Sequence, residues 1–175
     1  MIYQFKVELK YETASVYRIL EVDSETTFAE FHDVLQVAFG WENSHLHEFS
    51  IEKKDGELVG RIAIGMDLEG MGFSSKEVLD ETSEKLVDWF IQEEDYAIYT
   101  YDFGDDWRHE VVLFEILQKD PGRQYPYCVK AVQAAPDENS SGMMDESPMK
   151  KIDSRVWNKQ INDARESTGG EMEWI

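Results

Sequence analysis

The segment from Tyr99 to Leu113 constrains the fold more than any other part of the chain. Aromatic or apolar side chains occupy every second position on both sides of an acidic turn, which is typical of strands with one buried face. Gly104-Asp105 fits a two-residue type II′ turn, because glycine accepts a positive φ at the first central position. The segment therefore predicts a β-hairpin that brings three carboxylates close to Trp107 and His109.

Four other segments predict the rest of the sheet. Alternation from Tyr3 to Tyr11 predicts a half-buried strand, and Val16 to Val22 predicts its antiparallel partner. Arg18 falls on the apolar face of that partner, from which its long side chain is expected to snorkel to solvent. Further strands are predicted from His45 to Ile51 and from Leu58 to Ile64.

The first predicted helix has both of its ends marked in the sequence. Thr27 and Glu30 form a capping box, in which the hydroxyl and the carboxylate each satisfy a backbone donor. An apolar stripe at helical spacing continues to Phe39, and Gly40 supplies the stop. We expect this helix to pack across the first hairpin.

Two further helices and a loop are predicted in the remainder of the chain. A short helix is expected to run from Ser83, its N-cap, to Phe90. Pro126 to Gly142 is predicted to be mostly loop, with a mobile part at about 136–146. Ser147-Pro148 then starts a C-terminal helix at about 148–166, which is the only locally basic segment.

The charge balance narrows the classes of partner. Among 175 residues, 37 are acidic and 17 are basic, which gives a formal net charge of -20. Such a field repels phosphate backbones and anionic membranes and favours cationic partners. Direct nucleic-acid binding is therefore not expected.

Composition also bounds the compartment. A hydrophobic content of 42% and an aromatic content of 13% are those of a packed domain. Cys128 is the only cysteine, so no intrachain disulfide is possible and a reducing compartment fits. The first residues lack the pattern of a signal peptide, and no apolar run approaches ~18 residues. The protein is predicted to be cytoplasmic and not to contact a membrane.

These patterns together predict one α+β domain over residues 1–175. We expect a mixed, mostly antiparallel sheet curved around the first helix, followed by the C-terminal helix. The predicted element order is β-β-α-β-(β)-α-β-β-α.

Several motifs occur in order along the chain: Thr27-Phe28, Ala38-Phe39-Gly40-Trp41, His45-Leu46-His47-x-Phe49, Tyr99-x-Tyr101-Asp102-Phe103-Gly104-Asp105-x-Trp107-x-His109 and Tyr125-Pro126-x-Cys128. Over nearly the whole chain they resemble the root-inducing plasmid ORF-3-like family. The resemblance implies no defined reaction, although some members are described as transposon-passenger or resolvase-like proteins. Members usually carry a Cys-Pro-Pro-Glu-Asp-x-Gly-Gly loop, and this chain has Ala135 to Gly142 instead. A site that uses paired cysteines in relatives would have lost half of its ligands here.

One hypothesis for a site is a divalent metal held by acids and histidines. Its ligands would come from Asp102, Asp105, Asp106, His45, His47 and His109. Carboxylates suit hard cations, and imidazole shifts the preference toward zinc, manganese or iron. A metal there would activate water, so the corresponding function is that of a metal-dependent hydrolase. The structural alternative is that turn aspartates bond local backbone, histidines pack in the core, and Arg108 or Arg18 neutralises the acids.

The leading functional hypothesis is a non-catalytic binding or accessory module. Its recognition surface would lie on the concave face of the sheet and comprise His45, His47, Tyr101, Asp102, Asp105, Trp107 and His109. Aromatic rings and acids suit a basic or cationic protein or small molecule. Besides the metal-dependent hydrolase, a third hypothesis is a mobile-element, DNA-associated protein that acts through a partner chain.

Overall fold

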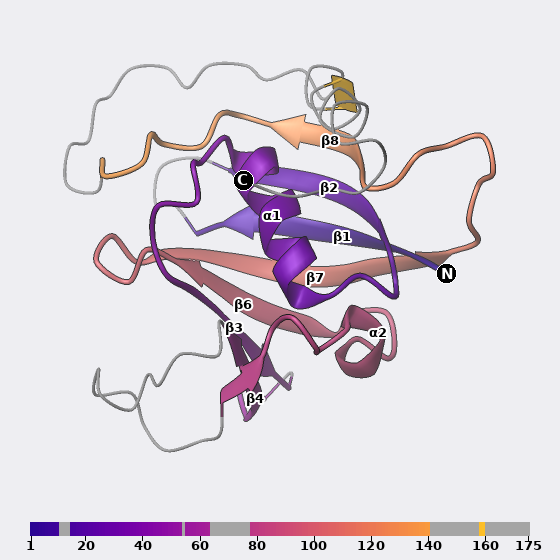
Figure 1. Ribbon diagram of the computed structural model, residues 1–175, viewed down its shortest axis with the longest axis horizontal. Helices are drawn as coiled ribbons and strands as arrows, with labels where there is room; N and C mark the ends of the chain where they lie inside the picture. The colour runs from indigo at the N-terminus through magenta and orange to yellow at the C-terminus, as the bar shows by residue number, and fades with distance from the viewer. Residues whose placement is uncertain (11–14, 54, 64–77, 141–157, 160–175) are drawn as a thin grey trace.

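An open sheet with one helix laid across one face dominates the computed structural model (Figure 1). The structure describes residues 1–10, 15–53, 55–63, 78–140 and 158–159. The strands are β1 (Ile2–Leu9), β2 (Val16–Asp23), β3 (His47–Glu52), β4 (Leu58–Ala63), β5 (Val78–Asp80), β6 (Tyr96–Tyr101), β7 (Trp107–Leu117) and β8 (Tyr127–Val132), and the helices are α1 (Phe28–Phe39) and α2 (Leu86–Trp89). The sheet has eight strands in the order β5-β4-β3-β6-β7-β1-β2-β8. Only the β4–β5 pair is parallel among these strands, which confirms the predicted mixed, mostly antiparallel α+β fold.

The core lies between the sheet and α1. Phe5 on β1 pairs with Leu113 on β7, and both are fully buried on the face that α1 covers. The ring of Phe31, on α1, lies 5.0 Å from that of Phe5, and Phe28 lies 5.0 Å from Phe49 on β3. The two-residue period of the strands and the helical period of α1 therefore place their apolar faces against each other, as predicted.

The capping box at the start of α1 is confirmed. Thr27 Oγ1 accepts a hydrogen bond from Glu30 N at 3.2 Å, and Glu30 Oε2 accepts one from Thr27 N at 2.8 Å. At the other end, Gly40 takes a φ of 77° and ends the helix. The same capping turn fixes α2 next to α1, because Leu86 N donates to Thr26 O at 3.0 Å.

The turn between β6 and β7 differs from the predicted type II′ hairpin. Positive φ angles occur at Asp102 (54°) and Asp106 (55°), whereas Gly104 does not take one. Asp102 Oδ1 accepts hydrogen bonds from Gly104 N at 3.0 Å and Asp105 N at 3.3 Å. Aspartate tolerates the left-handed region when its carboxylate bonds backbone two residues on. A positive φ was predicted at Gly104, whereas Asp102 and Asp106 take positive φ angles instead.

The last strand, β8, lies in a segment that was predicted to be loop. It pairs with β2 from Tyr17 to Glu21 and forms one edge of the sheet. The side chain of Asn158 covers part of that edge: its Nδ2 donates to Cys128 O, and its Oδ1 accepts from Cys128 N, both at 2.8 Å. A side-chain amide thus takes the place of a neighbouring strand at Cys128.

Two other boundaries were predicted wrongly. Helix α2 starts at Leu86 with Lys85 as its N-cap, and no side chain caps it. Ser83 Oγ, the predicted cap, donates to Asp80 O at 3.0 Å instead, next to the unpredicted strand β5. In β3, the strand begins at His47, so His45 lies in the connection before it.

Arg18 does not snorkel to solvent as predicted, because it is fully buried. Its Nε donates to Ala38 O at 2.6 Å, at the C-terminal end of α1, and one Nη donates to the carbonyls of Val132 and Gln133 at 3.1 and 2.9 Å. Burial lowers the pKa of Arg18 to about 10, and the guanidinium remains charged. Arg18 therefore joins the end of α1 to the end of β8. The backbone carbonyls of both elements replace water around the cation, which makes its burial tolerable.

The predicted C-terminal helix lies outside the described residues, except that positions 158 and 159 are helical. Residues 141–146 of the predicted mobile loop also lie outside them. No helix in the described part of the chain is both long enough and apolar enough to cross a bilayer.

Thr27→Ala is expected to lower the free energy of unfolding by about 1 kcal/mol, because the substitution removes the hydroxyl that caps α1. Urea denaturation followed by circular dichroism measures this loss. Ser83→Ala is the matched control: it removes an exposed hydroxyl that caps no helix, and a change within about 0.5 kcal/mol is expected. Equal losses in the two variants would contradict the assigned role of the capping box.

Candidate functional site

The predicted recognition residues gather at one end of the sheet, but most of them are interior. Of the seven, five are no more than 8% exposed: His47, Tyr101, Asp102, Trp107 and His109. His45 and Asp105 are half-buried. The concave face that was expected to bind a partner is covered by α1 and by the connection that follows it, at the left of Figure 1.

Trp41, which was not among the predicted site residues, forms the centre of this end. Its ring stacks on Tyr101 at 5.1 Å and lies 6.0 Å from Trp107 and 5.2 Å from His109. Its Nε1 donates to Pro136 O at 3.0 Å. Three of the predicted site residues thus pack around one tryptophan and stabilise the fold.

His109 is a neutral core residue. It is fully buried, and its Nδ1 donates to Tyr99 O at 3.2 Å. Burial lowers the pKa of His109 to about 3, because the charged imidazolium would lose its solvation there.

Glu138 fastens the segment after β8 to the connection between α1 and β3. Its carboxylate accepts hydrogen bonds from Tyr101 Oη at 2.6 Å, Glu42 N at 2.8 Å and Ser44 Oγ at 2.7 Å. Burial would raise the pKa of Glu138, but these donors outweigh it and the pKa is lowered. The described part of the predicted mobile loop is therefore bonded to the body of the protein.

The structure does not bring the six predicted metal ligands to a common centre. His45 Nε2 and Asp102 Oδ2 approach to 3.4 Å, whereas His47 bonds Glu81 and Asp106 bonds Arg108. Among the described residues, no three His, Cys, Asp or Glu side chains are grouped so that they could hold a metal ion. The Asp106–Arg108 pair, 3.0 Å apart, is the ion pair that the structural alternative expected.

A buried polar network links α1 to the sheet beside this end. The rings of His32 and His47 stack with centroids 3.4 Å apart and planes within 4°. His32 Nε2 donates to Asn43 Oδ1 at 2.8 Å, so His32 Nδ1 accepts from Tyr99 Oη at 2.8 Å. Tyr99 Oη accepts in turn from Gln36 Nε2 at 3.0 Å. His47 Nε2 donates to Glu81 Oε2 at 2.6 Å. Burial, with a smaller contribution from His47, lowers the pKa of His32 to about 3.

Of the residues in this network, His47 alone was a predicted site residue; Gln36, Asn43, Tyr99, His32 and Glu81 were not, and Asp33 lies close to the last two. His32 falls one residue after Phe31 on the buried side of α1, so helical spacing was the available signal. Burial and the Glu81 carboxylate raise the pKa of Asp33 to about 6. The network holds neutral and charged groups in fixed hydrogen bonds and leaves them little access to a partner.

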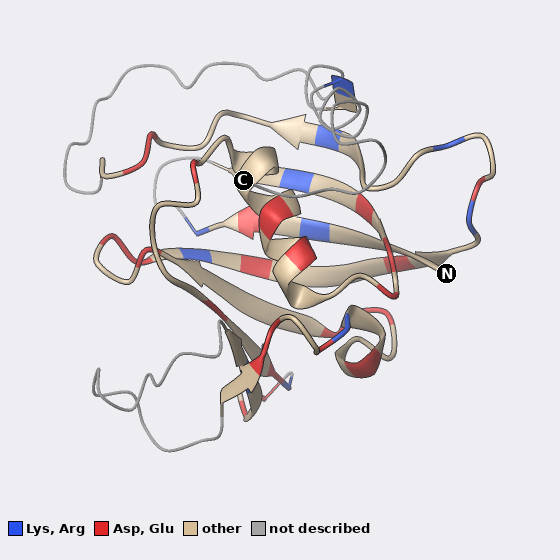
Figure 2. Cartoon of the chain, in the orientation of Figure 1, with Lys and Arg blue, Asp and Glu red and all other residues tan. Residues whose placement is uncertain are grey.

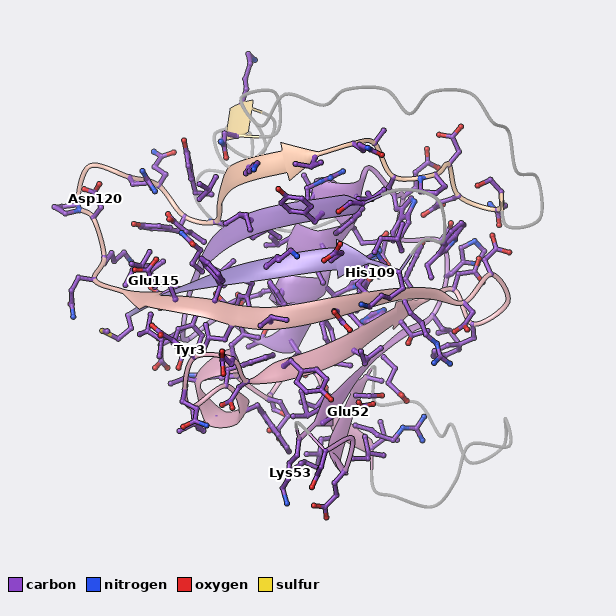
Figure 3. All side chains as sticks on the ribbon, turned by 180° about the vertical axis from the view of Figure 1, so that it is seen from behind. Tyr3, Glu52, Lys53, His109, Glu115 and Asp120 are labelled. Carbon is purple, nitrogen blue, oxygen red and sulfur yellow. The ribbon has the colours of Figure 1, made fainter. Side chains whose placement is uncertain are left out.

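The face of the sheet opposite α1, which Figure 3 shows, carries both signs of charge. Lys6 pairs with Glu8 at 2.6 Å, Lys10 pairs with Glu110 at 2.7 Å, and Arg61 pairs with Glu48. Opposite charges next to each other cancel at a distance, so this face presents no uniform field to a partner.

A cleft with a dominant sign lies at the other end of the sheet, beside α2. We call it the tryptophan cleft, and it is lined by Ile51, Glu52, Lys53, Val59, Asp88, Trp89, Ile91, Gln92, Glu94, Asp95 and Tyr96. Its volume is about 480 Å³. Four carboxylates accompany one lysine, whose Nζ is paired with Glu57 at 2.7 Å. Acidic residues on α2 and on the connection after it are visible in Figure 2.

Trp89 is held in place at the wall of this cleft. Its Nε1 donates to Glu84 Oε2 at 2.8 Å. The ring lies directly on the backbone of Gly60: a Cβ at that position would come within 2.7 Å of Trp89 Cζ3. The absence of a side chain at position 60 therefore makes room for the indole.

The sequence pattern that defines the plasmid pRiA4b ORF-3-like proteins matches residues 1–172. The chain belongs to this family.

Two relatives extend this result. The uncharacterised protein y4hQ of Sinorhizobium fredii (strain NBRC 101917 / NGR234) is 27% identical over 139 residues, which are 79% of this chain and 66% of y4hQ. MM3350, a protein of unknown function from Methanosarcina mazei Go1 with a known crystal structure, is 29% identical to this chain in sequence. The two structures agree with a TM-score of 0.70 over 99% of this chain and 84% of the other.

In this plasmid pRiA4b ORF-3-like protein, the motifs that carry the resemblance build the fold. Thr27 caps α1, Gly40 ends it, Trp41 fills the end of the sheet, and Asp102 shapes the β6–β7 turn. The tryptophan cleft lies outside those motifs, so the resemblance alone did not point to it.

His109→Asn is expected to make the protein less sensitive to acid. The pKa of His109 in the folded protein is about 3, below its ordinary value of 6.5. As the pH falls from 6.5 toward 3, the imidazole therefore takes up a proton in the unfolded chain but not in the folded one. The wild type therefore loses stability on acidification, by about 2 kcal/mol for this group between about pH 7 and pH 5. Asparagine keeps an N–H for Tyr99 O and does not titrate.

Urea denaturation of both proteins at the two pH values measures this effect. The difference between their free energies of unfolding should move by that amount in favour of the variant at the lower pH. Asp33 and His32 titrate in both proteins, so their contributions cancel in the comparison. A difference that does not change with pH would show that His109 is not held neutral by the fold.

Proposed function

We propose that this protein is a non-catalytic binding or accessory module that recognises a basic protein segment through the tryptophan cleft. The observation that carries the proposal is the convergence of four carboxylates and two aromatic side chains on one cleft. The side chains of Trp89 and Tyr96 are both partly exposed there.

The chemistry of the cleft suits a lysine or arginine side chain. An aromatic face attracts a cation through its quadrupole, and nearby carboxylates add Coulomb attraction. The apolar side chains of Val59 and Ile91, exposed by 49% and 68%, offer surface to the methylene stem of such a residue. A volume of about 480 Å³ accommodates one such side chain with part of its backbone.

The walls of the cleft are fixed before a partner arrives. Asp95 Oδ2 accepts from Ile91 N at 2.8 Å and Gln92 N at 3.0 Å, which holds the connection between α2 and β6. Trp89 is held by Glu84 and seated against Gly60. A preformed site loses less conformational entropy on binding, so modest contacts give measurable affinity.

The test is an NMR titration of isotope-labelled protein with a short synthetic peptide of alternating lysine and serine. We expect the indole N–H of Trp89 and the amides of Ile91 and Tyr96 to shift, with an affinity that falls as salt rises. The double variant Asp88→Asn, Glu94→Gln should bind the peptide about three- to tenfold more weakly. Each carboxylate contributes a fraction of a kcal/mol, up to about 1 kcal/mol, to the attraction of the cationic peptide.

The matched control is Glu42→Gln, Asp137→Asn, which removes the same charge from two exposed residues away from the cleft. It should leave peptide affinity close to that of the wild type. If both double variants weaken binding equally, the overall charge carries the interaction and the cleft does not. If the peptide shifts no resonance of the cleft, the proposal is wrong.

A further inference from the structure

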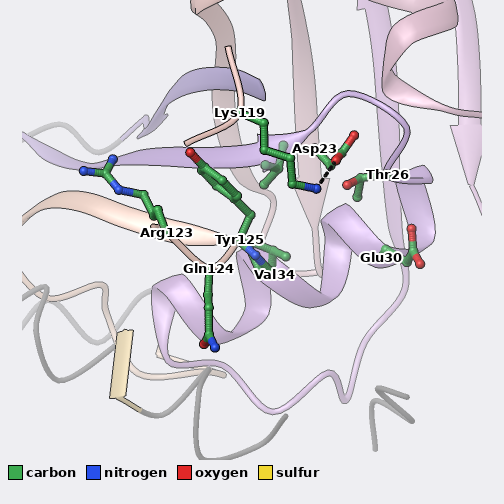
Figure 4. A pocket seen from close by; sticks show the side chains of 10 residues that line it. Asp23, Thr26, Glu30, Val34, Lys119, Arg123, Gln124 and Tyr125 are labelled. Atoms are coloured by element: carbon green, nitrogen blue, oxygen red, sulfur yellow. Dashed lines mark hydrogen bonds and ion pairs between the residues drawn. The ribbon is translucent and has the colours of Figure 1, made fainter. Parts of the chain in front are cut away.

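A second cavity lies between α1 and the loop that joins β7 to β8 (Figure 4). We call it the loop pocket, and its volume is about 410 Å³. Its apolar wall includes Val22 on β2, Val34 on α1 and the ring of Tyr125, which are exposed by 1%, 3% and 8%. Tyr125 is fixed in that position, because its hydroxyl accepts a hydrogen bond from Asp120 N at 3.2 Å. The pocket therefore has an ordered apolar surface of the size that small ligands occupy.

The two sides of the loop pocket carry opposite charges. Asp23 and Glu30 come from the β2–α1 side, and Lys119 and Arg123 come from the loop. Two acids and two bases balance each other here, although the chain as a whole carries a net charge of -20. This lining favours neither a simple anion nor a simple cation, and it suits a small molecule with both charges.

The ion pair between Lys119 and Asp23, which spans the pocket, can give way to ion pairs with a ligand. Lys119 Nζ lies 3.1 Å from Asp23 Oδ2, and their side chains are 61% and 35% exposed. An ion pair so open to water contributes little to stability, so a ligand can take over either partner. Arg123 is held at the edge, with its Nη1 on Glu21 at 2.6 Å and its guanidinium 4.4 Å from the centre of the Tyr127 ring.

We propose that the loop pocket binds a zwitterionic amino acid with an aliphatic side chain. Its carboxylate would pair with the ammonium of Lys119, and Arg123 would add positive charge on the same side. Its ammonium would be placed between Asp23 and Glu30, and its side chain would lie on the wall formed by Val22, Val34 and Tyr125. This site is separate from the tryptophan cleft, and each can fail without the other.

The test is isothermal titration calorimetry of the full chain with L-leucine and three relatives that each lack one feature. N-acetyl-L-leucine lacks the ammonium, L-leucinamide lacks the carboxylate, and glycine lacks the side chain. We expect L-leucine to bind and each relative to bind at least about tenfold more weakly, because each leaves a charged or apolar wall unmatched.

Two variants locate the binding. Lys119→Gln and Glu30→Gln should each weaken the binding of L-leucine by about two- to fivefold, because pairs with exposed side chains are worth a fraction of a kcal/mol to about 1 kcal/mol. Glutamine at position 30 keeps the capping box, since it too accepts from Thr27 N, so α1 should remain intact. Lys85→Gln is the control, because it breaks a similarly exposed pair, with Glu25 at 2.9 Å, outside the pocket.

Three results would overturn the proposal. One is the absence of heat from L-leucine at millimolar concentration in a protein whose circular dichroism is that of the folded chain. Another is equal binding of L-leucine by the wild type and by Lys119→Gln and Glu30→Gln. Binding of N-acetyl-L-leucine as tight as that of L-leucine would likewise show that the acidic side of the pocket has no role.

Discussion

One short helix has to cover a wide sheet, and this mismatch of dimensions governs the rest of the structure. Helix α1 has 12 residues and is therefore about 18 Å long. Eight strands spaced by about 4.8 Å span roughly 34 Å. The helix stripe buries the central strands, and other parts of the chain must exclude water from the flanks.

The parts of the sheet face that α1 does not cover are shielded from water by different segments at the two ends of the strands. At one end, Trp41 and the segment held by Glu138 pack over the β6–β7 turn. At the other, α2 and the β7–β8 loop are placed beside α1. Both proposed binding sites lie where this covering ends: the tryptophan cleft beyond α2, and the loop pocket beneath the β7–β8 loop. Partial cover leaves apolar side chains beside charged rims, which is the combination that ligand sites use.

Features set by local rules could be predicted from the sequence. The alternation in β1, β6 and β7 gave the buried faces, and Thr27 with Glu30 gave the start of α1. Features decided by distant contacts could not. Arg18 is buried because carbonyls from α1 and β8 meet around it, and no local pattern encodes that meeting. The same holds for the candidate sites, since Trp89 depends on Gly60 and Lys119 lies opposite Asp23. The residues selected from motifs were largely those that hold the end of the sheet together.

The amide of Asn158 on the edge of β8 limits how the sheet can grow. Both main-chain groups of Cys128 on that side are engaged by a side chain, in the geometry a ninth strand would use. An extended segment from another molecule would have to displace Asn158 before it could pair there. Edge pairing and the present position of Asn158 are therefore mutually exclusive. In this way a single amide can hinder the β8 edge from acting as a template for further strands.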